Sequence, residues 1–195
     1  MLLASLTLLA STTRRMPTPV AMEAASSAAS MPRAGHASLP ELCVFDLDAC
    51  LWDKEMFEME EMPGDCIMGD LNGRGEGVIG VMSGTDKIAL HAGALCALQE
   101  HADGLYPGMR CALASSANTP FAVKIGRAAL AKLEVLPGLT VWELLMRDWN
   151  GRDVNQIGRS PPLSPNKAAT HFPLLREATG IGFDKMLVRS AALRT

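Results

Sequence analysis

The chain has 195 residues, enough for one ordinary domain with a core and an appended segment, but not for two full domains. Hydrophobic residues make up 48% and charged residues 20%, and no apolar run approaches the roughly 20 residues of a membrane-spanning helix, so we expect a soluble globular protein and no membrane partner. The net charge of -3 shows no excess of Lys and Arg of the kind that binds nucleic acid, so we do not expect nucleic acid as a partner.

Residues 1–38 differ in composition from the rest of the chain. Ala, Ser, Thr, Pro and Met dominate, three arginines supply positive charge, and Glu23 is the only acid. Such a pattern is typical of organellar transit peptides, so we expect targeting to a plastid or mitochondrion, with the cytoplasm as the location otherwise. The apolar opening also fits a short secretory segment. A disordered tail, or a start placed too early with Met16, Met22 or Met31 as initiator, is the remaining interpretation.

From Leu42 the sequence alternates between short apolar runs and helical patterns, which indicates an α/β domain with a parallel sheet over residues 39–195. The apolar runs predict strands at 42–45, 111–114 and 186–188, with a weaker one at 154–158. Continuous apolar strands are typical of a sheet that is covered on both faces.

Helical patterns fill most of the intervals. They begin near residues 91, 119, 140 and 164. Pro120 is favourable at the first position of the second helix, and Thr140 with Glu143 forms a capping-box pattern at the start of the third. Gly180 is expected to end the fourth helix. Pro173 is expected to bend that helix, because proline removes one backbone hydrogen bond.

An insertion at residues 53–82 interrupts the alternation directly after the first strand. It contains a Gly-rich segment at 69–75 followed by an apolar run, which predicts a hairpin that forms a small cap or flap. We expect its methionines to pack it down rather than to bind substrate. These are Met56, Met59 and Met62.

Gly75, Gly77 and Gly80 match the spacing of a dinucleotide-binding fingerprint. That fingerprint must follow a strand and open a helix, whereas these glycines run into β-branched residues. We therefore interpret them as part of the hairpin.

The five cysteines are odd in number and include no Cys-x-x-Cys pair, so they suggest neither a zinc ribbon nor a disulfide framework. A reducing compartment fits this usage, and we interpret them mainly as small buried hydrophobic residues. They are Cys43, Cys50, Cys66, Cys96 and Cys111.

Two carboxylates, Asp46 and Asp48, follow the first apolar strand. The carboxyl ends of parallel strands form the ligand crevice of an open α/β sheet, so these side chains can converge on one small anionic substrate. An Asp-x-Asp pair is also common in solvated turns, and taken alone it does not distinguish the two interpretations.

Three motifs occur in order along the chain. Residues 45–52 read Phe-Asp-Leu-Asp-Ala-Cys-Leu-Trp, residues 114–120 contain Ser115 at a strand end, and residues 162–167 end in Lys167. They resemble the first, second and third motifs of the magnesium-dependent phosphatase-1 branch of the haloacid-dehalogenase-like (HAD-like) superfamily. The resemblance implies a three-layer Rossmannoid α/β sandwich.

By this resemblance, Asp46 is the nucleophile that forms an aspartyl-phosphate, and Asp48 is the general acid and base. Ser115 and Ser116 lie at substrate-binding positions, and Lys167 supplies the positive charge that holds phosphate beside the nucleophile. The implied cofactor is Mg²⁺, held by the Asp46 carboxylate, the main-chain carbonyl of Asp48 and an acid of a fourth motif.

The sequence departs from the family pattern at functional positions. Ser116 replaces a frequent arginine, which removes a phosphate or leaving-group contact. After Val188 the family continues into paired aspartates, whereas this chain reads Arg189, Ser190 and Ala191, so we expect a domain that is C-terminally truncated and lacks the C-terminal strand region.

Two functions are therefore expected. The first is magnesium-dependent phosphomonoester hydrolysis of the acid phosphatase or protein-tyrosine-phosphatase-like type, impaired by the lost fourth motif, with a phosphorylated small molecule or phosphoprotein as substrate. The second is a non-catalytic α/β remnant that binds phosphorylated ligands or a protein.

Overall fold

The computed structural model describes residues 39–189. The predicted targeting segment, 1–38, and the positions expected to carry the fourth motif, from Ser190 onward, lie outside the described residues. The chain divides between Ala37 and Ser38 into two units. Within the described part, no helix has the length and apolar character needed to cross a membrane.

The centre of the domain is a four-stranded sheet whose paired strands all run parallel. Its order is β8-β5-β1-β9, so the strand of this sheet that comes first in the chain lies between those that come second and last. Every residue of β1 is buried, as expected for a strand covered on both faces. The bounds are β1 Leu42–Phe45, β5 Arg110–Ser115, β8 Gln156–Ile157 and β9 Met186–Arg189.

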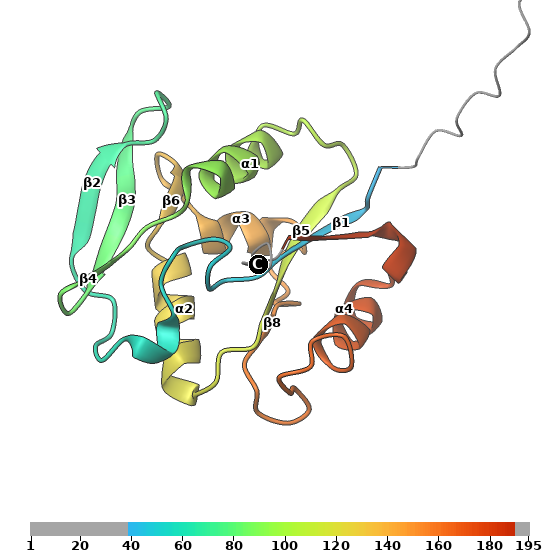
Figure 1. The fold of residues 1–195 in the computed structure, drawn as a ribbon. Helices are drawn as coiled ribbons and strands as arrows, with labels where there is room; N and C mark the ends of the chain where they lie inside the picture. The colour runs from blue at the N-terminus through green and yellow to red at the C-terminus, as the bar shows by residue number, and fades with distance from the viewer. Residues whose placement is uncertain (1–38, 190–195) are drawn as a thin grey trace, which may run out of the picture. The chain divides into compact units, whose positions relative to one another are not determined.

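Helices cover both faces of this sheet (Figure 1). Cys43 and Leu113 on one face join the core formed with α1, α2 and α3, whereas Val44 and Ala112 on the other face pack with Leu175 of α4. The prediction of a three-layer α/β fold is therefore confirmed. The helices are α1 Ala92–Ala102, α2 Pro120–Leu130, α3 Val141–Arg147 and α4 His171–Thr179.

Two predicted helix starts are confirmed by their caps. Thr119 accepts a hydrogen bond from the Ala122 amide at 3.0 Å, and Pro120 is the first residue of α2. The Thr140 and Glu143 side chains form both halves of a capping box before α3.

The predicted start of α4 at Ser164 is wrong. The Ser164 hydroxyl instead accepts a hydrogen bond from the Asn166 amide, and the Thr170 hydroxyl donates to the Asn166 carbonyl, so the segment forms turns and α4 begins only at His171. Pro173 is therefore in the first turn, where backbone amides have no acceptor within the helix, and the reason for the predicted bend is removed. Gly180 ends the helix in the left-handed region, as predicted, with φ of 73°.

The insertion after β1 forms the predicted hairpin and extends it to three antiparallel strands in the order β2-β3-β4. Met56 and Met59 are buried, but Met62 is 44% exposed, so its predicted packing role is wrong. The buried amide of Gln99 on α1 donates to the carbonyls of Leu71 at 3.0 Å and Val135 at 2.9 Å, which ties the insertion to the body. The remaining elements are η1 Met56–Glu58, β2 Cys66–Asp70, β3 Glu76–Ser83, β4 Asp86–Ile88, β6 Glu134–Leu136, β7 Leu139–Thr140 and η2 Phe183–Lys185.

Candidate active site

A cleft of about 270 Å³ lies where β1 and β5 end. Because these strands are parallel neighbours, Asp46 just after β1 and Ser115 at the end of β5 lie at the same edge of the sheet. The insertion contributes to the cleft through η1 and the residue before it, and strands β2 to β4 contribute none of its lining. The lining residues are Asp46, Asp48, Ala49, Glu55, Phe57, Ser115, Ser116, Ala117, Asn118 and Arg159.

Asp46 is held from two sides. One carboxylate oxygen accepts a hydrogen bond from the Leu47 amide at 2.9 Å, and the other forms an ion pair with the ammonium of Lys167. The two side chains are only 18% and 21% exposed. Lys167 lies just before α4, 121 positions after Asp46 in the sequence. The fold brings these two residues into contact. The ammonium offsets the negative charge of Asp46 at the edge of the cleft.

Asp48 has a different environment although it is only two residues away. Its carboxylate accepts hydrogen bonds from the indole nitrogen of Trp52 at 3.1 Å and from the Met56 amide at 3.4 Å. Partial burial raises the pKa of Asp48 from its ordinary 3.8 to about 6, and the nearby negative charges of Glu55 and Asp46 act in the same direction. A substantial fraction of Asp48 is therefore protonated in mildly acidic solution.

The end of β5 is fixed by a buried histidine that sequence reasoning treated only as part of a motif. The Nε2 atom of His171 lies 3.0 Å from the Ser115 carbonyl and 3.1 Å from that of Gly158. Burial lowers the pKa of His171, so the neutral ring can donate from Nε2 to both carbonyls. His171 thus joins the carboxyl ends of two strands to the start of α4, beside Lys167.

Arg159 is a cation of the cleft that sequence reasoning missed. Its Nε atom donates to the Ser116 carbonyl at 2.7 Å, which fixes the guanidinium at the cleft wall. Ser116 was predicted by resemblance as a substrate-binding residue, and its carbonyl holds the guanidinium of Arg159, which comes from another loop. Its position directly after the weak strand pattern at 154–158 was the available signal, because that strand ends at the same edge of the sheet.

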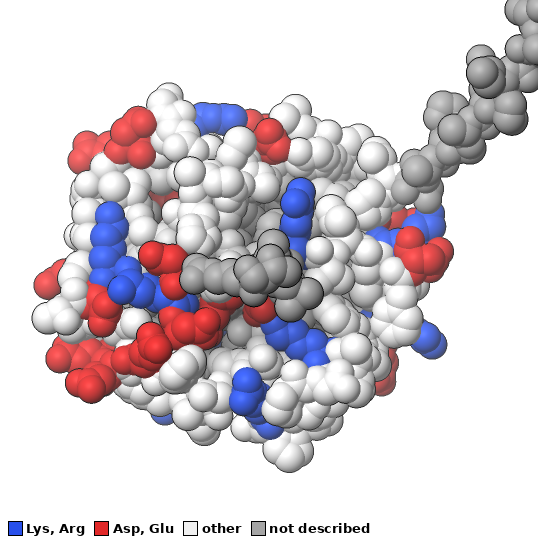
Figure 2. Space-filling view, in the orientation of Figure 1, with Lys and Arg blue, Asp and Glu red and all other residues white. Residues whose placement is uncertain are grey.

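The charge of the cleft is local. Figure 2 shows acidic side chains gathered over η1 and β4, where several line one hollow. Near the end of β1 the charge is different: Arg159 lines the cleft and Lys167 is paired with Asp46, so both cations are placed to bind an anion there. The acidic residues of that hollow are Glu58, Glu60, Glu61 and Asp86.

Oxygen donors in the cleft suit a hard cation such as Mg²⁺ in kind, because carboxylates and carbonyls are its preferred protein ligands. Asp46, Asp48 and Glu55 all line the cleft, but among residues 39–189 their ligand atoms do not form a close group of three. The described part of the cleft thus offers few metal ligands. One of its carboxylates, that of Asp46, is also paired with Lys167.

Comparison with known proteins gives one clear finding. A family model described as Acid Phosphatase matches residues 38–188, which is most of the chain and spans the whole site. No curated protein matches the chain.

Proposed function

This chain belongs to the acid phosphatase family of the HAD-like superfamily, and on that premise we propose that it hydrolyses phosphate monoesters in the cleft at the end of β1. The observation that carries the proposal is the contrast between two carboxyl groups two residues apart. Asp46 is paired with the Lys167 ammonium, whereas the pKa of Asp48 is raised to about 6. Pairs of titratable groups in such different environments are suited to separate roles as nucleophile and acid.

In the first step, an oxygen of the ionised Asp46 attacks phosphorus in line with the leaving oxygen. The new bond joins the Asp46 carboxylate to phosphorus, and the bond from phosphorus to the leaving oxygen breaks. Asp48 donates its proton to that oxygen, so the alcohol leaves as a neutral molecule. The raised pKa of Asp48 keeps this proton available in mildly acidic solution.

In the second step, water attacks the phosphorus of the aspartyl-phosphate. Asp48, now a carboxylate, takes a proton from that water, and the bond between phosphorus and Asp46 breaks. Inorganic phosphate leaves and both carboxyl groups return to their starting states.

The remaining groups of the cleft have binding roles in this proposal. Lys167 offsets the repulsion between Asp46 and phosphate, and Arg159 binds phosphoryl or leaving-group oxygens through its free guanidinium nitrogens. Ser115 and Ser116 provide hydrogen-bonding groups at the end of β5. The substrate is a phosphorylated small molecule or an exposed phosphate of a phosphoprotein.

We further propose that Mg²⁺ is held by the Asp46 carboxylate and the main-chain carbonyl of Asp48. When bound, it supplies positive charge that reduces the repulsion between carboxylate and phosphate. Ser190 and Ala191 occupy positions after β9 where paired aspartates are expected by resemblance. Weak magnesium binding follows, because this ion requires near-octahedral oxygen ligation.

The scarcity of acidic ligands in the described cleft also supports a second candidate, a protein that binds phosphorylated ligands without turnover. Both candidates predict phosphate binding at Lys167. Only the first predicts release of phosphate that depends on Asp46.

A magnesium titration with an aryl phosphate separates the two candidates. The Asp46→Asn variant should lose at least roughly a thousandfold in turnover, because the nucleophile is absent. Asp53→Asn is the matched control, since Asp53 is exposed and follows the same strand. Equal turnover in the wild-type protein and Asp46→Asn would refute the proposed chemistry. Phosphate binding without any turnover would favour the second candidate.

A further inference from the structure

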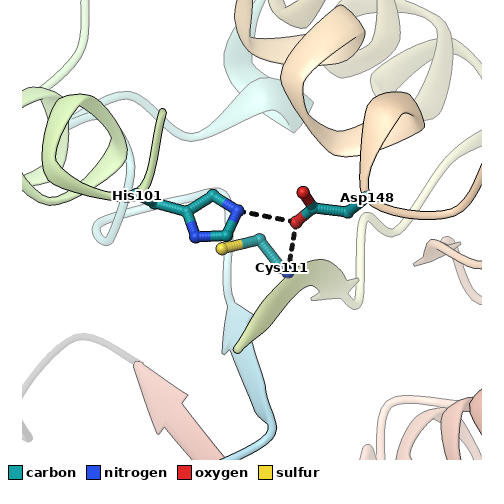
Figure 3. Close-up of side chains that lie close together, drawn as sticks. All are labelled: His101, Cys111 and Asp148. Carbon is teal, nitrogen blue, oxygen red and sulfur yellow. Dashed lines mark hydrogen bonds and ion pairs between the residues drawn. The ribbon is translucent and has the colours of Figure 1, made fainter. Parts of the chain in front are cut away.

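A second polar cluster lies on the face of the sheet covered by α1 and α3 (Figure 3). His101 comes from the last turn of α1, Cys111 from β5, and Asp148 from the end of α3. One potential ligand atom from each lies within 4.8 Å of the other two. Cys111 precedes Ser115 by four strand residues, roughly 13 Å along β5, so this cluster is separate from the phosphatase cleft.

The His101 ring is held in a defined orientation. Its Nε2 atom lies 2.7 Å from a carboxylate oxygen of Asp148, and the same oxygen accepts a hydrogen bond from the Cys111 amide at 2.7 Å. Because a carboxylate can only accept here, Nε2 is the donor of this hydrogen bond, and Nδ1 is the ring nitrogen left to act as a ligand. Histidines that bind metals through one nitrogen usually donate the other N–H to a carboxylate in this way.

The Nδ1 atom of His101 has no hydrogen-bond partner although it is buried. His101 as a whole is only 8% exposed. A buried polar atom without a partner is unfavourable, so a ligand bound to this nitrogen would stabilise the fold. No described side chain supplies one.

One buried thiol, that of Cys111, lies close to the His101 ring, and a second, that of Cys43, lies on the neighbouring strand. Cys111 on β5 and Cys43 on β1 are opposite one another in the parallel register, so both face the same side of the sheet. Together with His101 they line a cavity of about 240 Å³ whose other walls are largely apolar, with Arg189 as a charged residue among them. Burial raises the pKa of Cys43 to about 11 and that of Cys111 still further, so both remain thiols unless a cation replaces their protons.

We propose that His101 Nδ1 and the Cys43 and Cys111 sulfurs bind a zinc-class ion in this cavity, with Asp148 positioning the imidazole. Thiolate and imidazole ligands select Zn²⁺ over the oxygen-preferring Mg²⁺. Two thiolates, a neutral imidazole and a divalent ion sum to zero charge, which suits an apolar cavity. The ion links β1, β5 and α1.

X-ray absorption of the zinc-loaded full chain tests the ligand set without any variant. Two sulfur neighbours at about 2.3 Å and at least one nitrogen at about 2.0 Å are expected. Oxygen and nitrogen neighbours alone would overturn the proposal.

Cobalt substitution identifies the cysteines involved. Co²⁺ in the wild-type chain should give sulfur-to-metal charge-transfer absorption, which Cys111→Ser and Cys43→Ser should each reduce. Cys66→Ser and Cys96→Ser are matched controls, because both cysteines are exposed. A signal that follows Cys66 or Cys96 refutes the site.

The role of Asp148 has its own readout. Asp148→Asn preserves an acceptor for the Cys111 amide but removes the charge, and it should weaken zinc affinity roughly 10- to 100-fold. Unchanged affinity would mean that Asp148 does not position a metal-binding imidazole. None of these measurements uses phosphatase activity, so the outcome is independent of the function proposed for the cleft.

Discussion

Replacing Asp48 with asparagine should make the protein more stable and less active at the same time. The ionised carboxylate of Asp48 is unfavourable in the folded state, because burial is the main cause of its raised pKa. Asparagine removes the charge but retains an oxygen that can accept the hydrogen bond from Trp52. The main structural loss is the weak contact with the Met56 amide at 3.4 Å.

The magnitude follows from the displacement of the pKa. Raising it from 3.8 to about 6 corresponds to at most about 3 kcal/mol against the ionised folded state. Partial exposure and solvent screening reduce this figure, so we expect a gain in the free energy of unfolding of about 1 to 2 kcal/mol above pH 6. For a domain of this size that gain corresponds to roughly 3 to 6 °C in Tm.

The stability difference between Asp48→Asn and the wild-type protein should grow as the pH rises. Below pH 3.8 the Asp48 carboxyl is protonated in both the folded and the unfolded chain, so the variant has no advantage there. As the pH rises through 6, the wild-type protein loses the stability that the proton provided, and the advantage of the variant reaches its full size.

Urea unfolding of the wild-type protein, Asp48→Asn and the exposed control Asp53→Asn at several pH values measures this effect. Activity is compared on two esters: an alkyl phosphate, whose leaving oxygen needs a proton, should lose roughly 10²- to 10⁴-fold, and an aryl phosphate should lose less. Destabilisation of the variant at neutral pH, or a stability difference that does not change with pH, would refute the electrostatic reasoning. Equal losses on both esters would refute the role of Asp48 as acid.

Three further predictions concern other parts of the chain. Arg159→Ala should lower kcat/KM roughly 10- to 100-fold, because a charged hydrogen bond to the substrate is lost. Arg127→Ala, which removes a surface ion pair with Asp153, should leave kcat/KM unchanged. Similar values for both variants would exclude Arg159 from the cleft chemistry. Ser190→Asp should lower the magnesium concentration for half-maximal activity by roughly tenfold or more, and an unchanged titration curve would show that this position provides no ligand. Deleting residues 1–37 should leave the calorimetric unfolding temperature unchanged, and a clear decrease would place that segment in the folded core.

The reason why position 190 is informative is structural. The Arg189 carbonyl accepts a hydrogen bond from the Asp46 amide at 3.0 Å, so the strand that precedes Ser190 ends beside the proposed nucleophile. A carboxylate introduced at position 190 therefore directly follows a residue whose backbone is hydrogen-bonded to Asp46, at the edge of the sheet where we propose that magnesium binds.

Local patterns in the sequence were sufficient to predict the layers of the fold. Buried apolar runs identify β1 and β5, and the caps at Thr119 and Thr140 identify the starts of two helices, because these signals depend on neighbouring residues. The start of α4 was mispredicted for the same reason. Ser164 resembles an N-cap in sequence, but its hydroxyl is used within the turn that ends at Thr170.

Features that depend on long-range contacts could not be predicted. Cys66 and Cys96 are exposed although buried small residues were expected, since β2 turns the first outward and α1 does the same for the second. His101 and Asp148 have no motif spacing, and their 2.7 Å contact exists only because α1 and α3 pack on the same face of the sheet. The role of His171 likewise appears only when β5 and β8 are paired.

The side chain of Gln99 has a consequence for how the domain opens. Its amide donates to carbonyls of the insertion and of β6 from within α1, so separating any one of these three segments would leave a buried donor or acceptor without a partner. Hydrogen exchange of the hairpin amides should therefore report the same opening free energy as those of α1. We therefore expect the hairpin and the helix to open as one cooperative unit, or foldon, and we expect substrate entry to involve the short η1 segment rather than release of the hairpin.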